Sequence, residues 1–118
     1  MKRSVAICLL ALLGCAAEPR RAPVKAIVGA TLLNPGQAPV EYSVILVSGD
    51  RILRVGTMVD VPVPAGSEKV AAYGKFAAPV GEPIEAGQPA DLKILGEDPR
   101  QNPHAAPERV LAAGEWTK

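Results

Sequence analysis

The sequence has few cysteines, histidines and aromatic residues. Its 118 residues include two cysteines, Cys8 and Cys15, and one histidine, His104. A hydrolytic metal site needs about three His, Asp, Glu or Cys ligands and an open position, and a single histidine cannot establish a catalytic triad. The sequence therefore predicts no catalytic residue, no metal ligand and no cofactor site.

The apolar residues are mostly Val, Ala, Leu and Ile, with only four aromatic side chains. β-Branched residues favour strands, whereas the many alanines make a thin hydrophobic core. We expect Tyr42 and Trp116 to fill that core or its edge rather than to line a ligand pocket.

Charge of either sign is not in excess. The formal net charge is +1, and two of the positive residues, Lys2 and Arg3, stand at the N-terminus, so the remainder is about neutral. The sequence has no basic patch and no basic residues interleaved with aromatic ones. It therefore predicts no nucleic-acid partner.

Residues 1–14 have the pattern of an export signal. Lys2 and Arg3 precede an apolar run, Val5–Leu13, that is too short to cross a bilayer as a helix. The run ends in Leu12-Leu13-Gly14-Cys15, which resembles the lipobox of bacterial lipoproteins. The resemblance implies that the Cys15 thiol receives a diacylglyceryl group before cleavage. The alternative is an ordinary secretory signal cut near Ala16-Ala17, which would leave no anchor.

The positions of the cysteines agree with export. Cys8 lies within the signal and Cys15 at its end, so the folded domain carries neither a free thiol nor a disulfide. Residues 15–23 are a polar, proline-bearing tether. Lipidation would make the membrane a partner through stable acyl anchoring. Because Ala16 is not Asp, the pattern resembles sorting to the outer membrane of the bacterial envelope, facing the periplasm. The sequence identifies no protein partner.

The rest of the chain reads as short strands separated by turns. Two apolar runs around Ser48-Gly49-Asp50 predict a hairpin, and Ala90–Leu95 alternates apolar and polar residues as a half-buried strand does. The expected strands are Val24–Leu33, Tyr42–Val47, Arg51–Val55, Lys69–Tyr73, Lys75–Ala78, Ala90–Leu95, Arg109–Ala112 and Glu115–Thr117.

Prolines separate these strands and exclude helices of ordinary length. Val59–Gly66 is expected to be a loop or an edge strand and Gly96–Pro107 a loop, and Gly74–Asp91 is a connection rich in glycine and proline. We therefore predict an all-β fold, a small β-sandwich or barrel-like domain over residues 24–118.

The order of these segments resembles a known family. Residues 26–34, 44–56, 60–66 and 74–79 are similar to the N-terminal part of metal-dependent amidohydrolases of the imidazolonepropionase and dihydroorotase-like branch. Residues 85–99 and 110–116 resemble the segments with which these enzymes resume after their catalytic barrel. The resemblance implies that both flanks fold together into the β-sandwich called the composite domain.

In that family a (β/α)₈ barrel, typically about 250 residues, lies between the flanks. It carries a His-x-His pair, a bridging lysine or glutamate, two further histidines and an aspartate. Here only Val80–Ile84 separates the flanks, so residues 74–91 are interpreted as the junction where the barrel is missing. Asp91 is expected to accept hydrogen bonds from the preceding turn rather than to act in catalysis, and His104 to be an exposed loop residue.

Three functional hypotheses follow. The first is a non-catalytic, amidohydrolase-like composite domain with a binding or scaffolding role at the cell envelope. The alternative is a relic or partial subunit of a metal-dependent hydrolase acting on non-peptide carbon–nitrogen bonds, which would need a barrel from another chain. The third is a product without a selected role, for which cooperative melting would be absent. On its own, the chain is not expected to be an enzyme.

Overall fold

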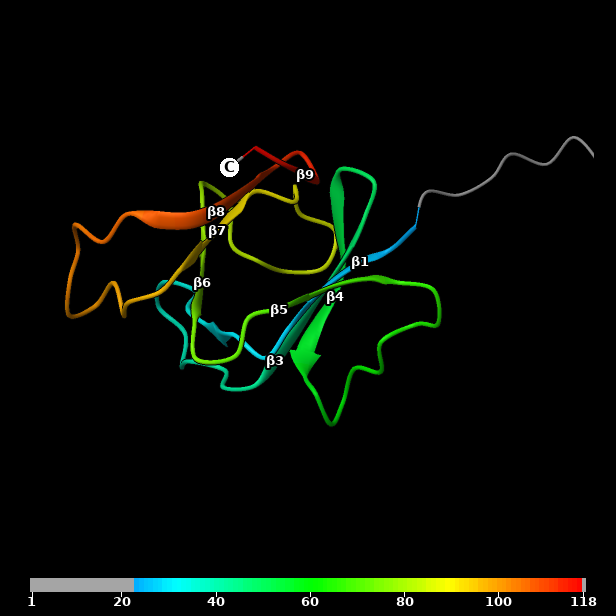
Figure 1. The fold of residues 1–118 in the computed structure, drawn as a ribbon, viewed down its shortest axis with the longest axis horizontal. Coiled ribbons are helices and arrows are strands. Elements are labelled where there is room, and N and C mark those ends of the chain that lie inside the picture. The colour runs from blue at the N-terminus through cyan, green and yellow to red at the C-terminus, as the bar shows by residue number, and fades with distance from the viewer. Residues whose placement is uncertain (1–22, 118) are drawn as a thin grey trace, which may run out of the picture.

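A computed structural model describes residues 23–117. The signal segment 1–14, Cys15 and all of the tether except Pro23 lie outside the described residues. Within residues 23–117 the regular elements are β-strands, arranged in two sheets (Figure 1). The predicted all-β class is therefore confirmed.

The first sheet, sheet A, has the strand order β4-β3-β1-β5. Its strands are β1 (Lys25–Val28), β3 (Ser43–Ser48), β4 (Arg51–Thr57) and β5 (Glu68–Ala71). β1 runs antiparallel to β3 and parallel to β5. The predicted β3–β4 hairpin is present, with Ser48 opposite Arg51 and a bulge between Leu46 and Val47.

The second sheet, sheet B, has the strand order β2-β6-β7-β8-β9. Its strands are β2 (Thr31–Leu32), β6 (Phe76–Pro79), β7 (Leu92–Leu95), β8 (Pro107–Ala112) and β9 (Glu115–Trp116). β2 is parallel to β6, and the other pairs are antiparallel. β6 and β7 are neighbours, so segments from both sides of the junction share one sheet.

The predicted first strand, residues 24–33, is wrong because the chain changes sheets in its middle. Gly29 has a φ of 96°, which favours glycine, and the Tyr73 ring occupies the space that a Cβ would need. The Gly29 N–H donates to the Ser43 carbonyl at 2.8 Å. The Thr31 N–H donates to the Lys75 carbonyl at 2.9 Å. The continuous apolar run therefore reflects two short strands that are buried in different sheets.

Other boundaries differ by a few residues. β5 ends at Ala71 because the chain turns there, with the Lys75 N–H donating to the Ala72 carbonyl at 3.1 Å. β7 begins at Leu92 rather than Ala90. The segments 59–66 and 96–106 lie between strands, as the prolines predicted.

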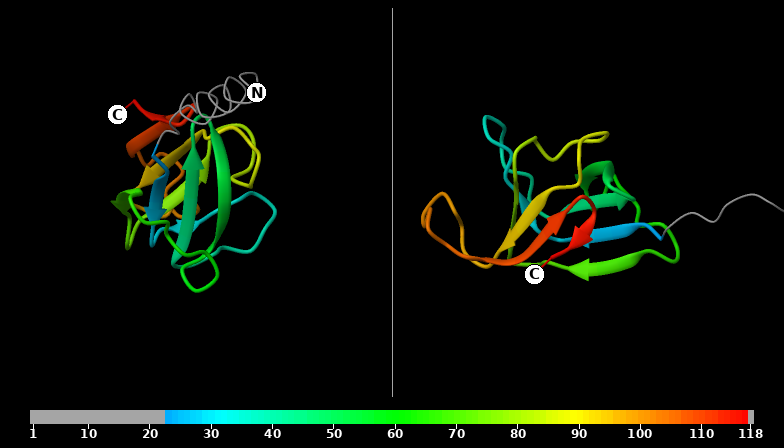
Figure 2. Two further views of the ribbon diagram at one scale, coloured as in Figure 1. Left: turned by 90° about the vertical axis from the view of Figure 1, so that its right-hand side faces the viewer. Right: turned by 90° about the horizontal axis from the view of Figure 1, so that it is seen from above.

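Side chains from both sheets form one hydrophobic core, and Figure 2 shows the strands of these sheets from two further directions. Its largest fully buried side chains include Ile27, Ile45 and Ile52 from sheet A and Leu92, Ile94 and Leu111 from sheet B. The other face of sheet A is covered by Val61, which packs with Ala26, Val44 and Leu46. β3 is thus buried on both faces, which explains its unbroken apolar sequence.

The two aromatic residues expected in the core behave differently. Trp116 packs against the core, as predicted. Tyr42 is 64% exposed, so that prediction is wrong. Its φ is 50°, and the following residue, Ser43, takes the buried position, where its hydroxyl donates to the Ala30 carbonyl at 2.7 Å.

The junction between β6 and β7 is integrated into the fold rather than looped out. The Asn34 side chain accepts a hydrogen bond from the Ile84 N–H at 2.8 Å and donates one to the Ile84 carbonyl at 3.0 Å. Both residues are buried. The Gly87 N–H donates to the Ile52 carbonyl at 2.8 Å, and the Ile52 N–H donates to the Gln88 carbonyl at 2.9 Å. The junction is therefore fixed to sheet A and to the turn after β2.

Replacing Asn34 by alanine should destabilise the fold substantially. The substitution leaves the buried N–H and carbonyl of Ile84 without their partners, at a cost of about 2 kcal/mol or more. The matched control is Gln37→Ala, which removes an exposed 3.0 Å contact with Glu85 in the same turn and should cost about 0.5 kcal/mol or less. Chemical denaturation measures both. Equal losses would contradict a structural role for the Asn34–Ile84 bonds.

Candidate functional site

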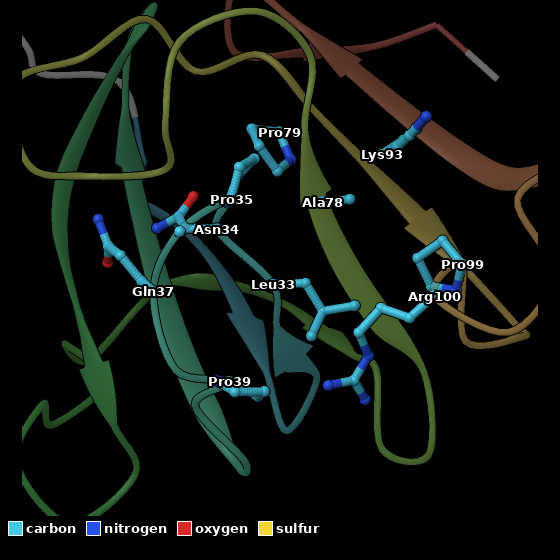
Figure 3. Close-up of a pocket in the computed structure, with 11 residues that line it drawn as sticks. Leu33, Asn34, Pro35, Gln37, Pro39, Ala78, Pro79, Lys93, Pro99 and Arg100 are labelled. Atoms are coloured by element: carbon cyan, nitrogen blue, oxygen red, sulfur yellow. The ribbon is translucent and has the colours of Figure 1, made fainter.

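A groove of about 430 Å³ lies beside sheet B (Figure 3). Ala78 of β6 and Lys93 of β7 are register partners, and their neighbours Ala77 and Ile94 point into the core. Because side chains alternate along a strand, Ala78 and Lys93 face away from the core and into the groove's lining. The small Ala78 side chain leaves the space open. The full lining is Leu33, Asn34, Pro35, Gly36, Gln37, Pro39, Ala78, Pro79, Lys93, Pro99 and Arg100.

The walls of the groove are mostly apolar and stiff. Pro35 and Pro39 come from the segment after β2, Pro79 ends β6, and Pro99 belongs to the loop after β7. Proline fixes φ, so these walls lose little conformational freedom when a ligand binds. Apolar walls with a few polar groups are typical of sites for small molecules.

The two amide side chains in the lining are already engaged. The Asn34 side-chain amide bonds to Ile84 twice, accepting at Oδ1 and donating from Nδ2, and the Gln37 Nε2 donates to a Glu85 carboxylate oxygen at 3.0 Å. These bonds join one wall of the groove to the junction. The wall formed by residues 33–39 is therefore held in place by the residues between β6 and β7.

Arg100 is oriented by Asp98, two residues earlier. Its backbone N–H and its Nε both donate to the Asp98 Oδ1 at 2.9 Å, and its Nη2 donates to Oδ2 at 2.6 Å. Hydrogen bonds from the Arg100 side chain lower the pKa of Asp98 below its usual value near 3.8, against the opposing effect of desolvation. The same bonds raise the pKa of Arg100. Asp98 thus fixes the direction of the guanidinium group.

Two residues were considered individually in the sequence, His104 and Asp91, and the structure places them in separate segments. His104 is exposed in the loop between β7 and β8, as predicted, and its N–H donates to the Asn102 side chain at 3.2 Å. The Asp91 Oδ1 accepts the Ala113 N–H at 2.7 Å. The predicted partner, the preceding turn, is wrong because the β8–β9 hairpin folds back over the start of β7.

Among residues 23–117, no group of three or more His, Cys, Asp or Glu side chains is placed to hold a metal ion. No helix in this part of the chain is long and apolar enough to cross a bilayer. Cys15, the predicted lipidation site, lies outside the described residues.

The groove was missed at the sequence level. Leu33, Ala78 and Arg100 come from three separate segments, and none of them belongs to a recognisable motif. The density of prolines was a signal for loops, but it gave no indication that these loops meet. Only the arrangement of sheet B brings them together.

A second surface feature is an exposed apolar patch at one end of sheet A, consisting of Tyr42, Met58, Val59 and Tyr73. Val59 is 93% exposed, and Tyr73 directs its hydroxyl toward the Met58 sulfur at 3.8 Å. The Met58 N–H donates to the Tyr42 carbonyl at 2.9 Å, which joins the two segments. Exposed apolar patches often mark interaction surfaces.

Comparisons with known proteins give partial matches. No protein-family model matches the chain, and no curated protein matches it either. Its structure is similar to molinate hydrolase, with 29% identity and a TM-score of 0.45, over 52% of this chain and 13% of that chain. It is also similar to a putative prolidase from Bifidobacterium longum, with 21% identity and a TM-score of 0.44, over 51% of this chain and 16% of that chain. The chain thus corresponds to a small part of either protein's length.

The Asp98–Arg100 pair can be tested by titration. We expect the Asp98 carboxyl to titrate below 3.8 in the native protein and to shift upward in an Arg100→Gln variant, because the hydrogen bonds that favour the carboxylate are lost. Because the pKa of Asp98 is lower in the folded state than in the unfolded state, the ionised carboxylate stabilises the fold fully at pH values above the unfolded-state pKa. This stabilisation is lost as the pH falls through the folded-state pKa. Carboxyl ¹³C NMR provides the measurement. An unchanged midpoint in Arg100→Gln would contradict the assignment.

Proposed function

We propose that residues 24–118 are an amidohydrolase-like composite domain without the catalytic barrel, with a binding role at the bacterial envelope. The observation that carries this proposal is the pairing of β6 with β7 across the junction. Pro79 lies opposite Leu92, and the Val80 N–H donates to the Asp91 carbonyl at 3.2 Å. The chain therefore leaves β6 and enters β7 at neighbouring points.

This geometry supports the interpretation of the junction as the place of a missing domain. Inserted domains commonly enter and leave their hosts at adjacent positions, so removal needs only a short connection. Residues 80–91 provide that connection, and Ile84 is buried within it. The segment resemblances on either side are in the order that the family has.

A binding role draws its support from the two surfaces described above. The groove has the size and the apolar character of small-molecule sites. The patch of Tyr42, Met58, Val59 and Tyr73 has the character of a protein-contact surface. The groove supports a role in ligand binding, and the apolar patch supports a scaffolding role.

The envelope location rests on the N-terminal sequence. The charged start, the apolar run and the lipobox-like end at Cys15 support lipidation, and residues 15–23 would tether the domain to the outer membrane, facing the periplasm. β1 begins at Lys25, so the tether leads directly into sheet A.

Replacing Cys15 by alanine should abolish lipid attachment. We expect the native chain in the membrane fraction with the mass of a diacylglyceryl cysteine, and the Cys15→Ala chain without that mass. Cys8→Ala is the matched control, since it changes a cysteine within the signal and should leave lipidation intact. Cell fractionation and mass spectrometry read the outcome. Identical soluble chains, cut near Ala16-Ala17 in both variants, would support an ordinary secretory signal instead.

The alternative function, a relic or partial subunit of a hydrolase of non-peptide carbon–nitrogen bonds, follows from the same resemblance. We expect the purified protein to contain no stoichiometric zinc and to hydrolyse neither amides nor cyclic imides. Metal analysis and a turnover assay test this expectation, and bound metal with turnover would overturn the non-catalytic proposal.

Affinity capture from membranes, followed by identification of any barrel-bearing partner, tests the hypothesis that the chain is a partial subunit. Cooperative thermal melting would argue against a product without a role.

A further inference from the structure

We propose that the groove beside sheet B binds a small aliphatic molecule carrying one carboxylate, which Arg100 recognises. This inference deepens the binding role proposed above and rests on it. It assigns that role to one site and one chemical class of ligand.

The argument begins with the charges around the groove. Its lining contains two cations, Lys93 and Arg100, and no carboxylate. Figure 3 shows the Arg100 side chain extending toward Leu33, whereas the Lys93 side chain points away from the other labelled residues. Arg100 is therefore the group placed to contact a ligand, and Lys93 adds positive charge at the edge.

Asp98 orients Arg100 without using all of its donors. The Asp98 carboxylate accepts from Nε and Nη2. A guanidinium group has five N–H donors in a fixed plane, so the Nη1 donors remain for an anion. The Arg100 side chain is 54% exposed, whereas that of Asp98 is 16% exposed. Ligand contact can thus occur on the accessible side while Asp98 holds the guanidinium from behind.

The balance of charge favours a monoanion. Lys93 and Arg100 together carry two positive charges, and Asp98 cancels one of them. The Glu85 carboxylate accepts a hydrogen bond from Gln37 and is not part of the lining. A carboxylate matches the remaining positive charge, whereas a phosphate dianion would bring an uncompensated charge toward apolar walls.

The walls define the rest of the ligand. Leu33, Pro35, Pro39 and Pro79 present saturated carbon, and Ala78 leaves space between them. These walls suit an aliphatic body rather than a polar one, and their stiffness lowers the entropic cost of binding. A molecule of the size of cyclohexanecarboxylate would place its ring against the prolines and its carboxylate at Arg100.

The test uses the protein expressed from the complete sequence and purified in the form that the expressing cell produces. Cyclohexanecarboxylate is titrated into the ¹⁵N-labelled protein, with cyclohexanecarboxamide as the uncharged isostere. We expect saturable shifts in the backbone amide signals of Leu33, Ala78 and Arg100. Cyclohexanecarboxamide should bind at least about tenfold more weakly than the carboxylate, because hydrogen bonds to a charged group are stronger. Inorganic phosphate should bind more weakly than the carboxylate.

Three variants complete the experiment. Arg100→Gln should weaken carboxylate binding about tenfold and leave amide binding unchanged. Arg51→Gln is the matched control, since it removes an exposed arginine at the start of β4 and should leave carboxylate binding as it is. Ala78→Leu should fill the groove and weaken both ligands. Thermal melting of each variant separates lost binding from lost folding.

Equal affinity for the carboxylate and the amide would overturn the inference, as would shifts outside the groove, tighter binding of phosphate, or equal effects of the Arg100 and Arg51 variants. Absence of saturable shifts in a chain that melts cooperatively would also overturn it. The envelope role is tested separately by lipidation of Cys15. Groove binding without lipidation would remove the envelope location alone, and lipidation without groove binding would remove this ligand assignment alone.

Discussion

Hydrogen bonds fix the segment between β6 and β7 to sheet A and to the turn after β2. Asn34 binds both backbone groups of Ile84, and Gly87 and Gln88 exchange backbone bonds with Ile52 of sheet A. Farther along, the Ala90 N–H donates to the Asp50 carbonyl at 2.9 Å. A segment that is rich in glycine and proline thus supplies the links between sheet A, sheet B and the turn after β2.

The groove depends on the same links. One of its walls is the segment from Leu33 to Pro39, and Asn34 fixes that segment to Ile84. The opposite wall belongs to the loop after β7, where Asp98 orients Arg100. The shape of the groove is therefore set by two groups of hydrogen bonds, the long-range pair between Asn34 and Ile84 and the local bonds between Asp98 and Arg100.

Sequence reasoning succeeded where the determining interactions are local. The Ser48-Gly49-Asp50 turn marked its hairpin because turn residues act within a few positions of themselves. Prolines likewise marked the two long loops. The all-β class followed from the same short-range signals, and the expected exposure of His104 followed from its place between prolines.

What the sequence did not reveal depends on contacts between distant residues. Nothing in residues 24–33 indicates that the chain changes sheets at Gly29, because the change depends on the pairing of Thr31 with the distant Phe76. The partner of Asp91 was missed since Ala113 approaches only through the final hairpin. The groove was missed for the same reason, because its lining comes from four separate parts of the chain, residues 33–39, 78–79, 93 and 99–100.

The connectivity of sheet B also sets the order in which the protein can assemble. β2 stands at one edge of this sheet and β9 at the other, so residues near the two ends of the described chain belong to one hydrogen-bonded unit. The β3–β4 hairpin can form as soon as it has been synthesised, but sheet B must wait for β7, β8 and β9. Sheet B is therefore complete only once β9 has been synthesised, long after the residues of its other edge strand, β2.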